Sequence, residues 1–188
     1  MKRKSIAVMG VAVALAALAA LATGVAMSAQ DRYSVKVPGG LSFSEFKGYQ
    51  TWQVISLSHN GDKLAVILGN PVMISALESG IPDNGKPFPD GAKMAKIHWI
   101  ATTKTGYPGP PAVAGSLHDV DFMVKDGKRF ADSGGWGYGA FEFDNATDTF
   151  RPGNTSDSPP QANDAKCGFG CHTIVKNRDY VFTEFPKR

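Results

Sequence analysis

Residues 30–188 of the sequence carry no excess of basic residues. No acidic residue precedes Asp31, and three of the 20 Lys and Arg residues lie at positions 2–4, so residues 30–188 carry 17 basic and 17 acidic groups. A net charge near zero argues against a nucleic-acid binder, which needs a basic surface to neutralise phosphates. The 21 Gly, 12 Pro and 43% hydrophobic residues are typical neither of collagen nor of a disordered chain. We therefore expect one loop-rich globular domain over residues 30–188.

Residues 1–29 are typical of a signal peptide. Basic residues at positions 2–4 precede an almost entirely apolar run over residues 6–25, and small residues at positions 24–29 offer a cleavage site. The run approaches the ~20 residues that span a bilayer, so a retained membrane anchor is the alternative. Either reading predicts a domain outside the cytoplasm, in the periplasm, where two cysteines are expected to be used rather than left as idle thiols.

The pattern of apolar runs and turns predicts a mainly β (α+β) domain, an antiparallel sheet with a few short helices. Strands are expected over residues 52–57, 63–68, 94–101, 117–125, 138–143 and 180–185, with Asn60-Gly61 as the turn of the first hairpin. Short helices are expected from Ser42 and over residues 72–78, after Pro71. The polar, proline-containing stretch over residues 145–165 is expected to be a surface excursion.

The most informative motif lies at residues 167–172, where Cys167 and Cys171 are followed directly by His172. A c-type haem is held by two cysteine thioethers, and the histidine after the second cysteine is its proximal iron ligand. The usual motif has two residues between the cysteines and this one has three, so Gly168 and Gly170 are expected to give the backbone the freedom to absorb the extra residue. The alternatives are a Cys167–Cys171 disulfide, and a zinc site that lacks an identified fourth ligand.

The strand expected around Lys96 has two different faces. Residues 95, 97 and 99 share one face, are apolar and suit a packed core. Lys93 lies on the same face at the start of the strand, where we expect it to be solvated. Met94, Lys96 and His98 form the other face, whose mixed polarity is typical of a cavity wall beside a cofactor. His98 in such a wall would carry protons near neutral pH, and the alternative is that it faces water.

The order and spacing of several segments resemble the cytochrome P-460 family, which is related to the cytochromes c′-beta. The resemblance runs from Phe46 to Phe185, and its segments are residues 49–52, 88–91, Lys96, 124–131, 135–136, the motif at 167–172 and residues 180–185. It implies an antiparallel β domain, often a homodimer, that carries one covalent haem c per chain with five-coordinate iron. Members oxidise hydroxylamine or bind nitric oxide, and the oxidising branch passes electrons to a soluble acceptor.

Lys96 matches the lysine that in this family bonds covalently to a meso carbon of the porphyrin. That bond would favour the hydroxylamine-oxidising branch over the gas-binding cytochromes c′-beta, which lack the lysine; Lys93 is the rival position. Two features depart from the family. Three residues separate the two cysteines where the family has two, and Ala162 stands where hydroxylamine-oxidising members carry a pocket carboxylate, with Asp164 as a nearby substitute.

The function expected of a haem depends on the sixth position of its iron. An electron carrier fills it with Met or His, and a catalyst or gas binder leaves it open. The candidate ligands are Met73, Met94, Met123, His59, His98 and His118, and the resemblance favours an open site. The sequence thus predicts a haem oxidoreductase acting on hydroxylamine or nitric oxide. The alternatives are a non-catalytic haem module that binds nitric oxide or transfers electrons, and a disulfide-stapled β domain without a cofactor.

Overall fold

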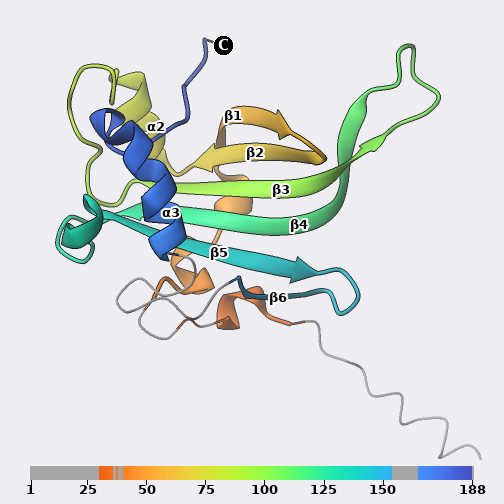
Figure 1. The fold of residues 1–188 in the computed structure, drawn as a ribbon, viewed down its shortest axis with the longest axis horizontal. Coiled ribbons are helices and arrows are strands. Elements are labelled where there is room, and N and C mark those ends of the chain that lie inside the picture. The colour runs from red at the N-terminus through yellow and green to blue at the C-terminus, as the bar shows by residue number, and fades with distance from the viewer. Residues whose placement is uncertain (1–29, 36, 38–39, 154–164, 188) are drawn as a thin grey trace, which may run out of the picture.

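The computed structural model describes residues 30–35, 37, 40–153 and 165–187. Its centre is a six-stranded antiparallel sheet in which the strands follow one another in chain order (Figure 1). The strands are β1 (Gln53–Asn60), β2 (Lys63–Gly69), β3 (Lys93–Thr103), β4 (Ala112–Lys125), β5 (Trp136–Asp144) and β6 (Thr149–Pro152). The expected mainly β class and antiparallel sheet are therefore confirmed.

The helices of the described residues are short. They are α2 (Pro71–Glu78), α3 (Ala165–His172) and the 3₁₀ helices η1 (Arg32–Ser34), η2 (Phe43–Phe46), η3 (Tyr49–Thr51), η4 (Ala131–Ser133) and η5 (Thr173–Arg178). The helix expected from Ser42 is η2, and the Ser42 backbone N–H donates to the Glu45 carboxylate at 2.9 Å. Within these residues no helix has the length and hydrophobicity to span a membrane. The expected signal peptide lies outside the described residues.

One face of the sheet is closed by the N-terminal part of the domain. Phe43 and Phe46 of η2 pack on Phe122 of β4, with ring centroids 5.2 and 4.0 Å apart, and Phe141 of β5 lies 4.9 Å from Phe43. Ala95, Ile97 and Trp99 of β3 join this cluster, as the alternation of the strand predicts. Burial of these aromatic rings makes this face the main hydrophobic core.

The opposite face carries a second cluster that leaves part of the sheet uncovered. Met73 and Leu77 of α2 pack with Met94 and Met123 of the sheet and with Val181 near the C-terminus. In Figure 1, α3 lies across the strands on the opposite side of the sheet from the 3₁₀ helices of the N-terminal part. The sheet thus separates the aromatic core on one face from the second cluster and α3 on the other.

Four sequence-based expectations need correction. The strand predicted over residues 180–185 is wrong, because this segment packs against the second cluster through its side chains and joins none of the six strands of the sheet. Its alternation instead buries Val181. β6 lies within the expected excursion, and His59 belongs to β1 rather than to the hairpin turn. Lys93 is half-buried rather than solvated, since its Nζ donates to the Glu45 carbonyl at 2.6 Å and lies over the Phe46 ring.

Candidate functional site

A cavity of about 460 Å³ lies on the sheet face that α3 covers. Strands β1 to β5, α3 and the C-terminal segment all contribute to its wall, and Ile67, Met94, Met123 and Tyr138 supply much of its apolar surface. The volume falls in the range of about 300–1,000 Å³ that is usual for ligand pockets. Lys96 and His172, which were singled out from distant parts of the sequence, line this same cavity.

The helix α3 carries the cysteine motif. Cys167 and Cys171 are four residues apart in an α-helix, so both side chains lie on one side of it, one turn apart. Both are exposed, neither is part of the cavity wall, and no disulfide joins them. The three-residue gap is therefore accommodated by regular helix rather than by irregular glycine backbone, which corrects the role expected of Gly168 and Gly170.

Gly168 has a packing role instead. A Cβ at Gly168 would lie 2.9 Å from Cβ and Cγ of Tyr138 on β5, whereas a Cβ at Gly170 would meet nothing within 4 Å. Tyr138 is 4% exposed and cannot move aside easily. The absence of a side chain at Gly168 therefore lets α3 approach the sheet closely enough to bring His172 into the cavity wall.

This contact predicts that two matched substitutions differ in their effect on stability. Both Gly168→Ala and Gly170→Ala gain up to about 1 kcal/mol of helix propensity, but only the first adds a clash, which typically costs about 1–3 kcal/mol. We expect Gly168→Ala to lower the free energy of unfolding by that amount relative to Gly170→Ala in urea titrations of the haem-loaded protein. Equal stability of the two variants would contradict the close packing.

The imidazole of His172 is held in one tautomer. Its Nδ1 lies 2.6 Å from the backbone carbonyl oxygen of Tyr180. A carbonyl can only accept, so Nδ1 carries the proton and Nε2 keeps its lone pair. Burial lowers the pKa of His172, the charge of Lys96 lowers it further, and the hydrogen bond to Tyr180 opposes both. The ring is therefore neutral at pH 7 and able to ligate a metal through Nε2.

The side chains of Lys96 and Lys93 separate onto the two faces of β3. Lys96 is half-buried in the cavity wall, and its register partner on β4 is Asp121, which lines the cavity too. Lys93 lies on the other face against Glu45 and Phe46. Lys96 is thus the lysine of the two that can meet a bound group.

His98 does not line the cavity, contrary to the expectation for this face. Its Nδ1 contacts the carboxylate of Asp119, whose second oxygen lies 2.7 Å from Nδ1 of His118. Burial alone would raise the pKa of Asp119, but the hydrogen bonds and charges of the two histidines outweigh it and hold that pKa below its ordinary value. Asp121 connects this group to the cavity, with its Oδ2 3.8 Å from Nδ1 of His98.

A metal ion is the alternative use of this group. Donor atoms of His98, Asp119 and Asp121 lie within 4.8 Å of one another. His98 and Asp119, however, already contact each other directly, so each has a protein partner for the atom that an ion would use. The arrangement therefore suits proton exchange between neighbouring carboxylates and imidazoles better than coordination.

The other candidate residues divide between cavity, core and surface. Met94 and Met123 are in the cavity wall, Met73 is fully buried in the core, and His59 is exposed near the end of β1. Ala162 and Asp164 lie outside the described residues. Sequence reasoning missed Asp121 and Glu184, two carboxylates of the wall. The alternation of β4 could have indicated the first once its register with β3 was known, but no pattern marked the second.

A model of the cytochrome P460 family matches residues 46–183. The chain belongs to the cytochrome P460 family. A search of curated proteins gives no match. Membership of the cytochrome P460 family implies a haem cofactor and a relation to hydroxylamine oxidation.

The cavity fits the haem that cytochrome P460 membership implies. Its apolar wall suits a porphyrin, and the Nε2 lone pair of His172 suits an iron ion. The hydroxyl of Tyr138 is buried in the same wall and has no hydrogen-bond partner within the described part of the chain. An unpartnered buried hydroxyl is costly unless a bound group or water satisfies it. The donor set and the wall therefore agree with the family assignment.

Proposed function

We propose that the protein is a periplasmic mono-haem oxidoreductase of the c type that acts on hydroxylamine or nitric oxide. The observation that carries the proposal is the meeting of Lys96 and His172 in one cavity, beside a helix that presents two thiols on successive turns. Membership of the family implies the haem, and Lys96, His172 and the two cysteines would provide its attachment and its environment.

Four residues would hold the group. Cys167 and Cys171 form the thioethers, His172 binds iron through Nε2, and Lys96 supplies a third covalent attachment at a meso carbon. When bound, the haem accepts electrons from the substrate and passes them to a soluble acceptor. The half-buried amine of Lys96 lies in the wall of the cavity, where it can reach a bound porphyrin, and the covalent bond would form from its uncharged form.

Oxidation of hydroxylamine also releases protons, and Asp121 is placed to accept them. It is in the wall opposite Lys96 in the sheet register, where it supplies the carboxylate that Ala162 cannot. Behind it lie His98, Asp119 and His118, a row of acceptors that ends at the surface. Because 3.8 Å exceeds a hydrogen bond, transfer from Asp121 to His98 requires a bridging water or a small rotation of the carboxylate.

This role predicts a large kinetic effect for Asp121→Asn. A positioned base typically contributes about 10²–10⁴-fold, so we expect kcat for hydroxylamine to fall by ~10²-fold with the haem spectrum unchanged. His98→Gln should have a smaller effect of the same kind, because it acts behind Asp121. Glu142→Gln is the matched control: this carboxylate has similar exposure, 43% against 46%, but pairs with Arg151 outside the cavity. An unchanged kcat in Asp121→Asn would remove the carboxylate from the mechanism.

The function itself is tested by steady-state turnover of hydroxylamine with an artificial electron acceptor. The proposal expects saturable turnover in the haem-loaded protein and none after removal of the haem. Binding of nitric oxide without turnover would instead assign a gas-binding module. A low-spin ferric spectrum with a sulfur or bis-imidazole signature would assign an electron carrier.

A further inference from the structure

The carbonyl that holds His172 belongs to an unusual turn. Asp179 and Tyr180 both have left-handed backbone conformations, with φ of 48° and 64°. This region is unfavourable for residues other than glycine and persists only where the surroundings impose it. The two residues reverse the chain after η5 and bring the Tyr180 carbonyl to 2.6 Å from Nδ1 of His172. Something must therefore fix the turn against its own backbone preference.

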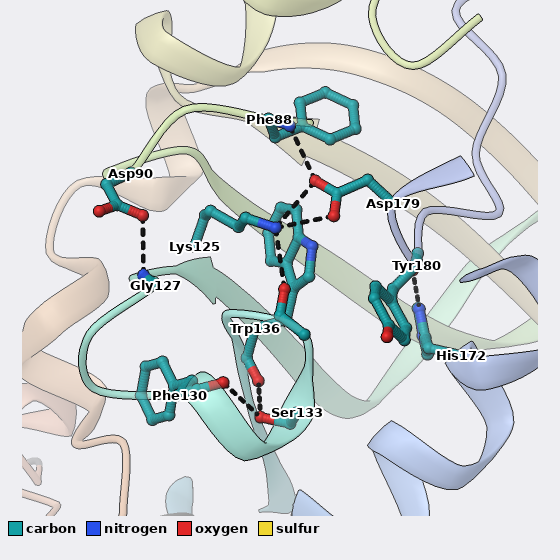
Figure 2. Close-up of polar contacts among 11 residues, drawn as sticks. Phe88, Asp90, Lys125, Gly127, Phe130, Ser133, Trp136, His172, Asp179 and Tyr180 are labelled. Atoms are coloured by element: carbon teal, nitrogen blue, oxygen red, sulfur yellow. Dashed lines mark hydrogen bonds and ion pairs between the residues drawn. The ribbon is translucent and has the colours of Figure 1, made fainter. Parts of the chain in front are cut away.

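A buried ion pair fixes its first residue. The Nζ of Lys125, at the end of β4, donates to the two carboxylate oxygens of Asp179 at 2.7 and 2.9 Å (Figure 2). The side chains are only 8% and 13% exposed. Lys125 also donates to the Gly134 carbonyl at 2.9 Å, and the Phe88 backbone N–H donates to Asp179 at 2.7 Å. Asp179 is thus tied directly to the end of β4 and to the loop before β3, and through Lys125 to the loop before β5.

Packing fixes the second residue. The ring of Tyr180 lies so close to Gly134 that a Cβ there would stand 2.2 Å from the ring. On its other side the ring packs against Phe169 of α3, 5.7 Å away between centroids. The Tyr180 carbonyl therefore has little freedom to move relative to His172.

We propose that the Lys125–Asp179 ion pair positions the proximal histidine by holding the turn whose Tyr180 carbonyl accepts the Nδ1 proton of His172. The inference rests on the proposed role of His172 as iron ligand. A hydrogen bond at the second ring nitrogen fixes the tautomer and orientation of a ligating histidine and makes it a stronger donor. Stronger donation stabilises the ferric iron and lowers its reduction potential. Lys125 and Asp179 are positioning residues, and neither lines the cavity.

An ordinary stabilising role is the competing explanation. Buried ion pairs are weak evidence for stability, because removing two charges from water offsets much of their attraction. A purely structural pair would change the unfolding midpoint and leave the iron–histidine bond as it is. A positioning pair would change that bond in protein that is still folded and haem-loaded.

The test is resonance Raman spectroscopy of the ferrous haem-loaded protein, with its midpoint potential. Asp179→Asn keeps the size of the side chain but removes its charge, and Lys125→Met keeps the apolar stem. We expect both to shift the iron–histidine stretch to lower frequency and to raise the potential. Lys125→Arg keeps the charge, so its stretch and its potential should stay near those of the wild type. This variant also provides the measurement if either neutral variant fails to accumulate.

Asp83→Asn is the matched control. It removes the charge of an exposed carboxylate that lies 2.6 Å from Arg178, the residue before Asp179. Asp83 itself makes none of the bonds that hold Asp179 or the Tyr180 carbonyl. It should leave the stretch and the potential unchanged. An unchanged stretch in Asp179→Asn, or an equal shift in Asp83→Asn, would overturn the positioning role. His172→Gly separates a failure of this proposal from a failure of the proposed function. If the stretch is lost in His172→Gly, the ligand assignment stands and a negative result concerns the ion pair alone. If the stretch is retained, the ligand assignment itself is wrong.

Discussion

Replacing His172 by glycine is expected to abolish the iron–histidine bond while the thioethers still form. The residue supplies the Nε2 lone pair in the cavity wall, and the hydrogen bond to Tyr180 keeps that atom available. Loss of a residue that merely supports a ligand typically costs 10–100-fold, so we expect loss of the ligand itself to lower hydroxylamine turnover by at least ~10²-fold. The measurement is the ferrous absorption spectrum with parallel kinetics.

Added imidazole provides the control for this variant. The space left by the ring is bounded by Tyr138 and Phe182, whose rings lie 5.2 and 5.0 Å from that of His172. Imidazole should enter it and restore much of the wild-type ferrous spectrum. A spectrum that is the same in His172→Gly and the wild type, without imidazole, would mean that another residue ligates the iron.

Replacing Lys96 by methionine is expected to remove the proposed third covalent attachment completely. The new C–N bond replaces a meso C–H and an N–H, a two-electron oxidation in which a peroxide takes up the two electrons and two protons as it is reduced to water. The cross-linked tryptic peptide should therefore weigh the sum of its parts less two hydrogens. Methionine keeps a similar length and apolar stem, so haem loading through the cysteines should persist. We expect hydroxylamine turnover to be lost and nitric oxide binding to remain, because the porphyrin then resembles that of the gas-binding branch.

Lys93→Met is the control for this prediction. Lys93 lies three residues earlier on the same strand but on the other face, against Phe46. Its replacement should leave the cross-link intact. An unmodified Lys96 peptide in full yield from haem-loaded wild-type protein would instead contradict the cross-link and leave the gas-binding or electron-transfer function.

The sheet could be predicted well because its strands carry local signals. The strand expected over residues 94–101 is β3, Lys93–Thr103, and its alternation correctly assigned Lys96 and Ile97 to different faces. The same kind of alternation misled at residues 180–185, since the periodic burial of Val181 does not require a neighbouring strand. A pattern reports which side chains are buried, whereas a ladder depends on a free edge elsewhere in the chain.

The candidate site was predictable only in its chemical groups. The residue types and spacing of the motif singled out Cys167, Cys171 and His172 as candidates, and the structure places His172 in the cavity wall. They did not predict the helix that carries all three. Gly168 and Gly170 have low helix propensity, so the local sequence does not indicate a helix. The close packing of Gly168 on Tyr138 of β5 is a tertiary contact that stabilises it. The pairing of Lys125 with Asp179 joins residues 54 positions apart. Such long-range contacts arise from the complete fold, so no local pattern could reveal them.

The central claim is that one haem is covalently attached at Cys167 and Cys171, and mass spectrometry of the mature protein from a host that matures c-type cytochromes tests it most directly. The proposal predicts a mass equal to the polypeptide plus one haem, and a tryptic haem peptide that contains both cysteines. The haem should also survive a denaturing gel. Two unmodified thiols, or a disulfide between Cys167 and Cys171, in that material would contradict the account.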